Sequence, residues 1–199
     1  MTPEEILQGI QQRAAATLNA SVVTDPVIRE RVDYVCRCMS NRAGVRLLMS
    51  CLLGKLDKPN VDPRKPYTEI GGADSFSGRT YDERYLTKFI NEHRLPVNPT
   101  TAFLTPTLRN IDHALTTDRE LVGRPRDLYK KTLELLEDVA LQRIPADVLF
   151  VETVRVLMLL RDEKLARMAS LLDALDRTEG ALPLSSEAIV TLISQHLAC

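Results

Sequence analysis

The sequence has no tryptophan, and only 5% of its residues are aromatic. No apolar run approaches the ~20 residues that a membrane-spanning helix needs. The start, Met-Thr-Pro-Glu-Glu, lacks the basic and apolar regions of a secretory signal. Neither sign of charge is in large excess, since the formal net charge is −1. We therefore expect a cytoplasmic protein with no membrane partner, in which any contact with nucleic acid comes from locally placed arginines.

Cysteine is also scarce, with four residues in the chain. Cys36-x-Cys38 points its two sulfurs to different faces of a helix, and no C-x-x-C pair of the kind that binds zinc is present. A cytoplasmic chain of this size does not need a disulfide framework. We expect buried or half-buried free thiols, and no metal held by this chain.

Apolar residues at helical spacing predict an all-α, multi-helix fold. No segment alternates convincingly with period two, although a small hairpin in the middle is left open. Prolines after capping residues indicate several of the starts, and the last two helices before Gly180 can be continuous. The expected helices cover residues 3–18, 26–39, 45–56, 80–92, 125–141, 145–160, 162–178 and 188–197.

A long polar loop region, about residues 57–80, and an irregular central segment interrupt this pattern. A loop of this length inside a compact domain is usually functional or mobile. One interpretation is an ordered loop anchored to the core by Tyr67, Ile70 and Phe76. The other is an exposed linker with a sub-boundary near residue 65. Thr80 and Glu83 have the spacing of a capping box and predict the start of the helix that follows.

The sequence shows no catalytic motif that we can assign. It contains no H-E-x-x-H, Walker phosphate loop or G-x-G-x-x-G. The nearest match to a metal-dependent nuclease is Asp162-Glu163-Lys164. Its context is a helical pattern rather than a strand, which favours a solvated helix face. A small hydrolase that uses Ser75 or Ser77 with Asp74 and His93 remains an alternative.

Basic and amide side chains are interleaved through the centre of the chain. Arginine pairs in bidentate fashion with phosphates or guanine edges, and asparagine pairs likewise with adenine. The pattern is therefore compatible with a DNA-contacting surface. The alternative is internal pairing, with Arg79 and Arg84 bridging Asp74, Asp82 or Glu83. The candidate DNA-binding residues are Arg79, Arg84, Lys88, Arg94, Asn98, Arg109 and Arg124.

Longer stretches resemble a known family. The first are Phe76-Ser-Gly-Arg-Thr-Tyr-Asp-Glu-Arg-Tyr-Leu, Leu95-Pro-Val-Asn-Pro-Thr-Thr-Ala-Phe-Leu-Thr-Pro and Leu121-Val-Gly-Arg-Pro. Later ones are Glu152-Thr-Val-Arg, Leu160-Arg-Asp-Glu-Lys and Leu182-Pro-Leu-Ser-Ser-Glu-Ala-Ile-Val. From about residue 30 onward the chain resembles the SacI-type family of type II restriction endonucleases. The resemblance implies a restriction-modification hydrolase that cuts short palindromic double-stranded DNA with Mg²⁺, through a PD-(D/E)xK core. It also implies a homodimer, because a palindromic site has two-fold symmetry.

We expect residues 1–199 to be the helical N-terminal region of a longer nuclease, with the nuclease core absent. The predicted last helix reaches Cys199 without a glycine cap or polar tail, as at a domain boundary. Its expected role is DNA recognition, or dimerisation and support of the core, with Mg²⁺ needed only by the full-length enzyme. The alternative function is a protein-interaction module, in which the leucine-rich helices after Pro125 dock a partner.

Overall fold

The computed structural model describes residues 1–38, 41–97, 113–118 and 126–178. These residues form helices and contain no β-strand, which confirms the all-α prediction. The chain divides into two compact units, residues 1–160 and 161–199. The candidate DNA-binding residues that the structure describes lie in the first unit.

Nine helical segments occur in the described residues, and most of their positions follow the prediction. The two expected helices over 145–160 and 162–178 are one continuous helix, α7. The segments are α1 (Pro3–Ala16), α2 (Pro26–Arg37), α3 (Asn41–Asp57), the 3₁₀ turn η1 (Thr68–Ile70), α4 (Gly78–Tyr81), the π-helical turn η2 (Asp82–Leu86), α5 (Thr87–Glu92), α6 (Arg126–Ala140) and α7 (Ala146–Thr178).

The first two helices start where their capping residues predict. Thr2 and Glu5 form a capping box: the Thr2 hydroxyl accepts from the Glu5 amide, and the Glu5 carboxylate accepts from the Thr2 amide at 2.7 Å. The Asp25 carboxylate accepts from the Val27 amide at 2.8 Å at the start of α2. Local side-chain chemistry therefore fixes both starts.

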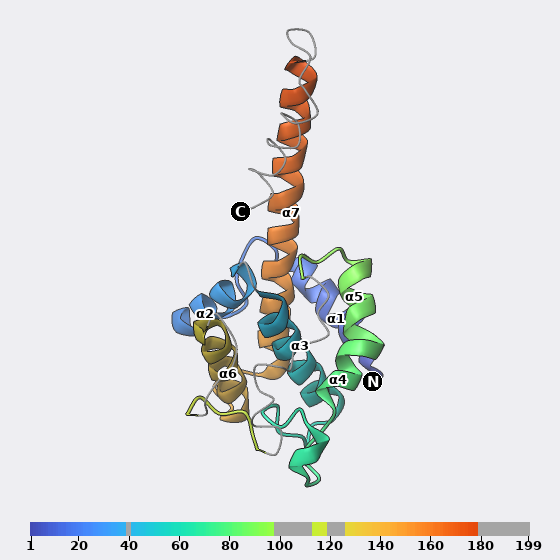
Figure 1. Ribbon diagram of the computed structural model, residues 1–199. Helices are drawn as coiled ribbons and strands as arrows, with labels where there is room; N and C mark the ends of the chain where they lie inside the picture. Colours follow the sequence, from blue (N-terminus) through green and yellow to red (C-terminus); the bar gives the residue numbers. More distant parts are fainter. Residues whose placement is uncertain (39–40, 98–112, 119–125, 179–199) are drawn as a thin grey trace. The chain divides into compact units, whose positions relative to one another are not determined.

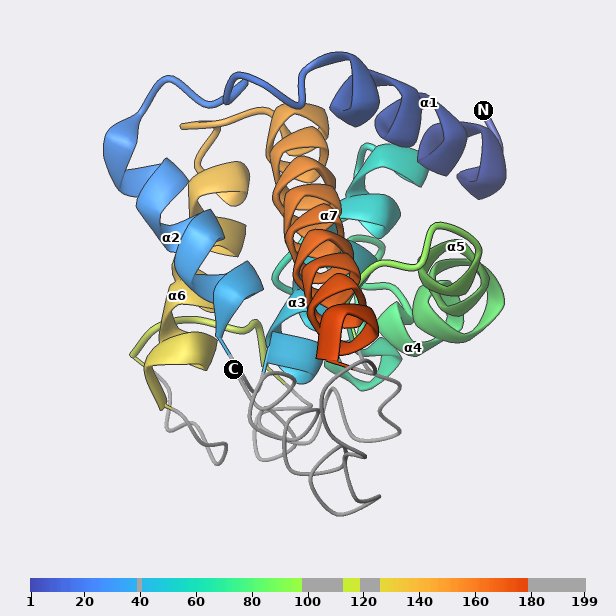
Figure 2. The same ribbon diagram turned by 90° about the horizontal axis from the view of Figure 1, so that it is seen from above.

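Helix α3 lies at the centre of the first unit, with α2 and α6 to one side and α1, α4 and α5 to the other (Figures 1 and 2). Residues 43–53 of α3 are buried on every side, as expected of a helix that is largely apolar all round. Gly54 allows another element to approach closely, because a Cβ built there would lie 2.6 Å from a ring carbon of Phe76. Two polar residues, Arg46 and Ser50, share this buried environment.

The long loop before α4 is ordered and folds back on itself. The Asp62 amide donates to the Asp74 carbonyl at 2.9 Å, and the Phe76 amide donates to the Lys65 carbonyl at 3.1 Å. Tyr67 and Phe76 are buried in the core, as the ordered interpretation requires. Residue 65 lies inside the first unit.

The start of the next helix differs from the prediction. Ser77, and not Thr80, is the capping residue, because its hydroxyl accepts from the Thr80 amide at 3.3 Å. Thr80 itself lies inside α4, and its hydroxyl donates to the Ser77 hydroxyl at 2.9 Å. Ser77 and Thr80 are both residues that can cap a helix, and they lie three positions apart. The helix starts after Ser77, the one that directly follows the loop.

In the second unit, the structure describes residues 161–178, which form the last part of α7. Leu165, Met168 and Leu172 are large apolar side chains of this helix that are about half exposed. Within the described residues, no helix is long and apolar enough to cross a membrane.

Candidate nucleic-acid interface

Four of the candidate DNA-binding residues lie on one continuous helical segment that runs through α4, η2 and α5 and ends just after them. We call Arg79, Arg84, Lys88 and Arg94 the basic segment. All four side chains belong to exposed residues. The candidates that the structure describes are therefore all exposed and lie within residues 79–94, and two of them, Arg84 and Lys88, line one groove.

Two members of the basic segment pair with acids one turn away. Arg79 Nε lies 2.7 Å from Glu83 Oε1, and Lys88 Nζ lies 3.8 Å from Glu92 Oε1. All four side chains are more than half exposed, and exposed pairs of this kind contribute little to stability. Arg79 thus has one of the internal partners that the alternative proposed, yet its guanidinium remains open to a competing anion.

Arg84 does not bridge Asp74, Asp82 or Glu83 as the internal alternative proposed. Its guanidinium carbon lies 5.7 Å from the centre of the Tyr85 ring, a cation–π arrangement. Asp74 forms an ion pair with Lys65 at 2.6 Å, and Asp82 forms one with Arg46. Among the described residues, no acid pairs with Arg84.

Arg94 adopts a backbone conformation that favours glycine. Its φ is +50°, and the Arg94 and Leu95 amides donate to the carbonyls of Asn91 and Ile90 at 3.2 and 3.0 Å. These two bonds form a Schellman motif that ends α5, with arginine at the position where glycine is preferred. A non-glycine residue in such a conformation prompts a search for what its side chain does. The exposed Arg94 guanidinium has no acidic partner among the described residues.

A groove of about 490 Å³ runs between α1 and the η2–α5 part of the segment. The α1 wall carries three amide side chains and one acid, and the other wall carries cationic, aromatic and acidic side chains. The polar and aromatic lining residues are Gln8, Gln11, Gln12 and Glu4 on α1, against Arg84, Tyr85, Lys88, Phe89, Glu92 and His93. Glutamine and arginine can read the edges of adenine and guanine, and lysine can contact phosphate. The three glutamines were not found from the sequence, since they read as the solvated face of an amphipathic helix.

The segment is fastened to α3 by two side-chain contacts that the sequence did not reveal. The Tyr81 hydroxyl donates to Asp57 Oδ2 at 2.5 Å. Arg46 Nη2 donates to Asp82 Oδ2 at 2.8 Å, and both of these side chains are almost fully buried. Burial raises the pKa of Asp82, and the hydrogen bond and charge of Arg46 only partly offset that rise.

The remaining predicted site residues do not come together in the described part of the chain. Asn98, Arg109 and Arg124 lie outside the described residues. The proposed hydrolase residues are engaged separately. Ser75 donates to the Gly72 carbonyl, Ser77 bonds to Thr80, and the His93 ring lies 4.7 Å from Phe89. Within residues 1–38, 41–97, 113–118 and 126–178, no three His, Cys, Asp or Glu side chains gather as a metal site would require.

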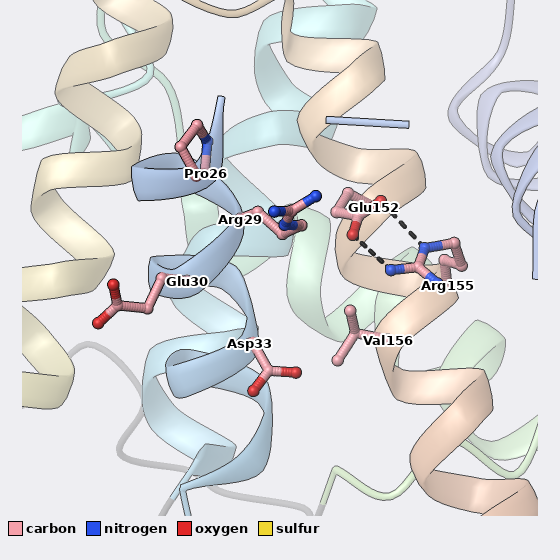
Figure 3. A pocket seen from close by; sticks show the side chains of 7 residues that line it. All are labelled: Pro26, Arg29, Glu30, Asp33, Glu152, Arg155 and Val156. Carbon is pink, nitrogen blue, oxygen red and sulfur yellow. Dashed lines mark hydrogen bonds and ion pairs between the residues drawn. The ribbon is translucent and has the colours of Figure 1, made fainter. Parts of the chain in front are cut away.

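A second pocket, of about 330 Å³, lies between α2 and α7 and is lined mainly by charged residues (Figure 3). Its central acid, Glu152, is fully satisfied: it accepts from Arg155 at 2.6 and 3.0 Å, from Ser21 at 2.9 Å and from the Val22 amide at 3.0 Å. Burial alone would raise the pKa of Glu152, but these hydrogen bonds hold it below the usual value. Arg155 also donates to the Leu18 carbonyl. The arrangement ties the chain after α1 to α7, which is a structural role.

Comparison with known proteins does not identify a relative. The sequence matches no family model, no curated protein and no solved structure.

Proposed function

We propose that this chain is the helical DNA-contacting part of a type II restriction endonuclease. The single observation that carries the proposal is the basic segment. It presents four exposed cationic side chains along one helical stretch, and Arg84 and Arg94 have no acidic partner in the described part of the chain. The resemblance of residues 76–86 to the SacI-type family supports the same function.

The chemistry of the segment suits double-stranded DNA. Arginine and lysine side chains neutralise phosphates and position the protein on the duplex, while amide and guanidinium groups can reach base edges. The proposed contact is therefore electrostatic at the basic segment, with Gln8, Gln11 and Gln12 of the groove available for base contacts.

In the full-length enzyme, the proposal includes a homodimer on a palindromic site and Mg²⁺-dependent cleavage. The described residues do not fit a magnesium centre, because they contain no cluster of three possible ligands. We accordingly assign no catalytic step to them, and the proposed contribution of this region is binding.

Fluorescence anisotropy with a labelled random duplex at about 50 and 200 mM salt tests the proposal, because phosphate contacts weaken over this range. We expect Arg84→Ala with Lys88→Ala to lower the affinity and to reduce the salt slope by about two. Arg29→Ala is the matched control, since Arg29 is an exposed arginine of α2 outside the segment. Equal affinities of the double variant and the control would refute the proposal.

An interaction module is the second candidate function, and one observation favours it. Leu165, Met168 and Leu172 are about half exposed on α7. Six of the other leucines that the structure describes after Pro125 are buried in the first unit's own core and so cannot dock a partner: Leu128, Leu133, Leu135, Leu136, Leu149 and Leu157. Binding to a partner protein that Leu165→Ser with Leu172→Ser abolishes, and that salt leaves unchanged, would support this candidate.

A further inference from the structure

The basic segment contains a π-helical turn held by a buried charge from another helix. In η2, the Thr87 amide donates to the Asp82 carbonyl, which is the i to i+5 bond of a π turn. The Thr87 hydroxyl donates to the same carbonyl at 2.9 Å. Single π turns within helices are rare and occur frequently at functional sites.

Arg46 of α3 joins both ends of this turn. Its Nη2 atom donates to Asp82 Oδ2 at 2.8 Å and to Thr87 Oγ1 at 2.6 Å. Asp82 begins η2, and Thr87 directly follows it. One guanidinium nitrogen therefore spans the five residues of the turn, which include Arg84 and Tyr85.

The ion pair between Arg46 and Asp82 is not bidentate, because Arg46 Nη2 is shared between Asp82 and Thr87. Arg46 Nε and Asp82 Oδ1 are buried and have no hydrogen-bond partner. By contrast, Arg155 donates to Glu152 through both Nε and Nη2, and Arg64 does the same to Asp62. A buried donor and acceptor left unpaired are costly. A bidentate contact between Arg46 and Asp82 would pair Arg46 Nε with Asp82 Oδ1. It is not formed in the structure, where Arg46 Nη2 also donates to Thr87.

From these contacts we propose that Arg46 is a positioning residue for DNA binding. It holds the π turn so that Arg84 and Lys88 face the groove beside α1. This proposal rests on the proposed DNA-contacting function. Arg46 itself is 3% exposed and cannot touch DNA, so its effect has to pass through the shape of η2.

The test compares a variant that keeps the buried positive charge at position 46 with one that removes both charges of the buried pair. Arg46→Lys keeps a cation that can donate to both Asp82 and Thr87. Arg46→Met with Asp82→Leu removes both charges together, which in other proteins is often neutral for stability. The control is Glu152→Leu with Arg155→Met, which removes a buried pair from the other side of the core.

Two readouts are needed, and the probes are a labelled random duplex and hydrogen exchange of the amides of residues 83–88. For Arg46→Met with Asp82→Leu, we expect about a tenfold loss of affinity, a salt slope smaller by about two, and faster exchange in η2. We expect Arg46→Lys to bind as the wild type does, and the control pair to leave both the affinity and the salt slope unchanged.

The outcomes separate this inference from the proposed function. Wild-type affinity and salt slope in Arg46→Met with Asp82→Leu would overturn the positioning role, even if the chain binds DNA well. If the wild type binds no duplex, the proposed function fails. Whether or not the wild type binds DNA, unchanged hydrogen exchange of residues 83–88 in the double variant would overturn the claim that Arg46 holds the π turn.

Discussion

Replacing Arg94 with glycine is expected to move stability and DNA binding in opposite directions. Arg94 closes α5 with a φ of +50°, in the left-handed region that costs a residue with a side chain about 1–2 kcal/mol. Glycine avoids that cost but gives up about 0.5–1 kcal/mol through the greater freedom of the unfolded chain. The expected net gain in the free energy of unfolding for Arg94→Gly is therefore about 0.5–1 kcal/mol.

A matched control exists at the end of α6. Gln142 has a φ of +57°, and the Gln142 and Arg143 amides donate to the carbonyls of Val139 and Asp138 at 3.1 and 2.8 Å. This is the same Schellman motif with another non-glycine residue, outside the basic segment. Gln142→Gly should gain a similar amount of stability and leave DNA binding unchanged.

The assay is thermal unfolding followed by circular dichroism, together with anisotropy on a labelled duplex. A gain of about 0.5–1 kcal/mol corresponds to a rise in Tm of about 1–4 °C in a chain of this size. We expect both glycine variants to melt higher than the wild type. Only Arg94→Gly should bind DNA more weakly, with a salt slope lower by about one because one phosphate contact is lost. Unchanged DNA affinity in Arg94→Gly would show that the arginine is at this position for no reason connected with DNA.

Two further changes test the packing of the first unit. Glu152→Gln leaves the buried Arg155 cation without its counter-charge, so it should lower the free energy of unfolding by about 3–5 kcal/mol at pH 7. Because the folded pKa of Glu152 is depressed, its stabilising effect is present above the unfolded pKa and is lost as the pH falls through the folded value. The difference between wild type and variant should therefore shrink in acid, and urea unfolding at pH 7 and pH 3 would show a constant difference if this account is wrong. Gly54→Ala would place a Cβ 2.6 Å from the Phe76 ring and should cost about 1–3 kcal/mol through overpacking, whereas an unchanged Tm would mean that the ring moves freely.

Local sequence signals were sufficient to predict most helices of this fold. Thr2 and Asp25 mark the helix starts that the structure shows, because a cap depends only on residues within one turn. The same local logic placed the next start at Thr80, where the structure uses Ser77. Spacing alone does not decide between two nearby hydroxyls, since the path of the preceding loop selects which one reaches the amide.

The candidate interface was harder to predict, because its support comes from distant parts of the chain. Arg84 and Lys88 were found from the sequence as charged residues on an exposed helix. Arg46 was not, because it lies 36 positions before its partner Asp82, within a stretch of α3 that reads as apolar. The Arg79–Glu83 pair is one that the sequence offers as an internal alternative, because an i, i+4 spacing is visible in the sequence.

The most direct test of DNA contact by the basic segment is site-specific photocrosslinking. A benzophenone side chain would replace Arg84 in one variant and Arg29 of α2 in another, each mixed with the same labelled duplex. The account predicts a crosslink from position 84 that disappears as the salt is raised, and none from position 29. Equal crosslinking from both positions, or none from position 84 in a folded chain, would contradict it.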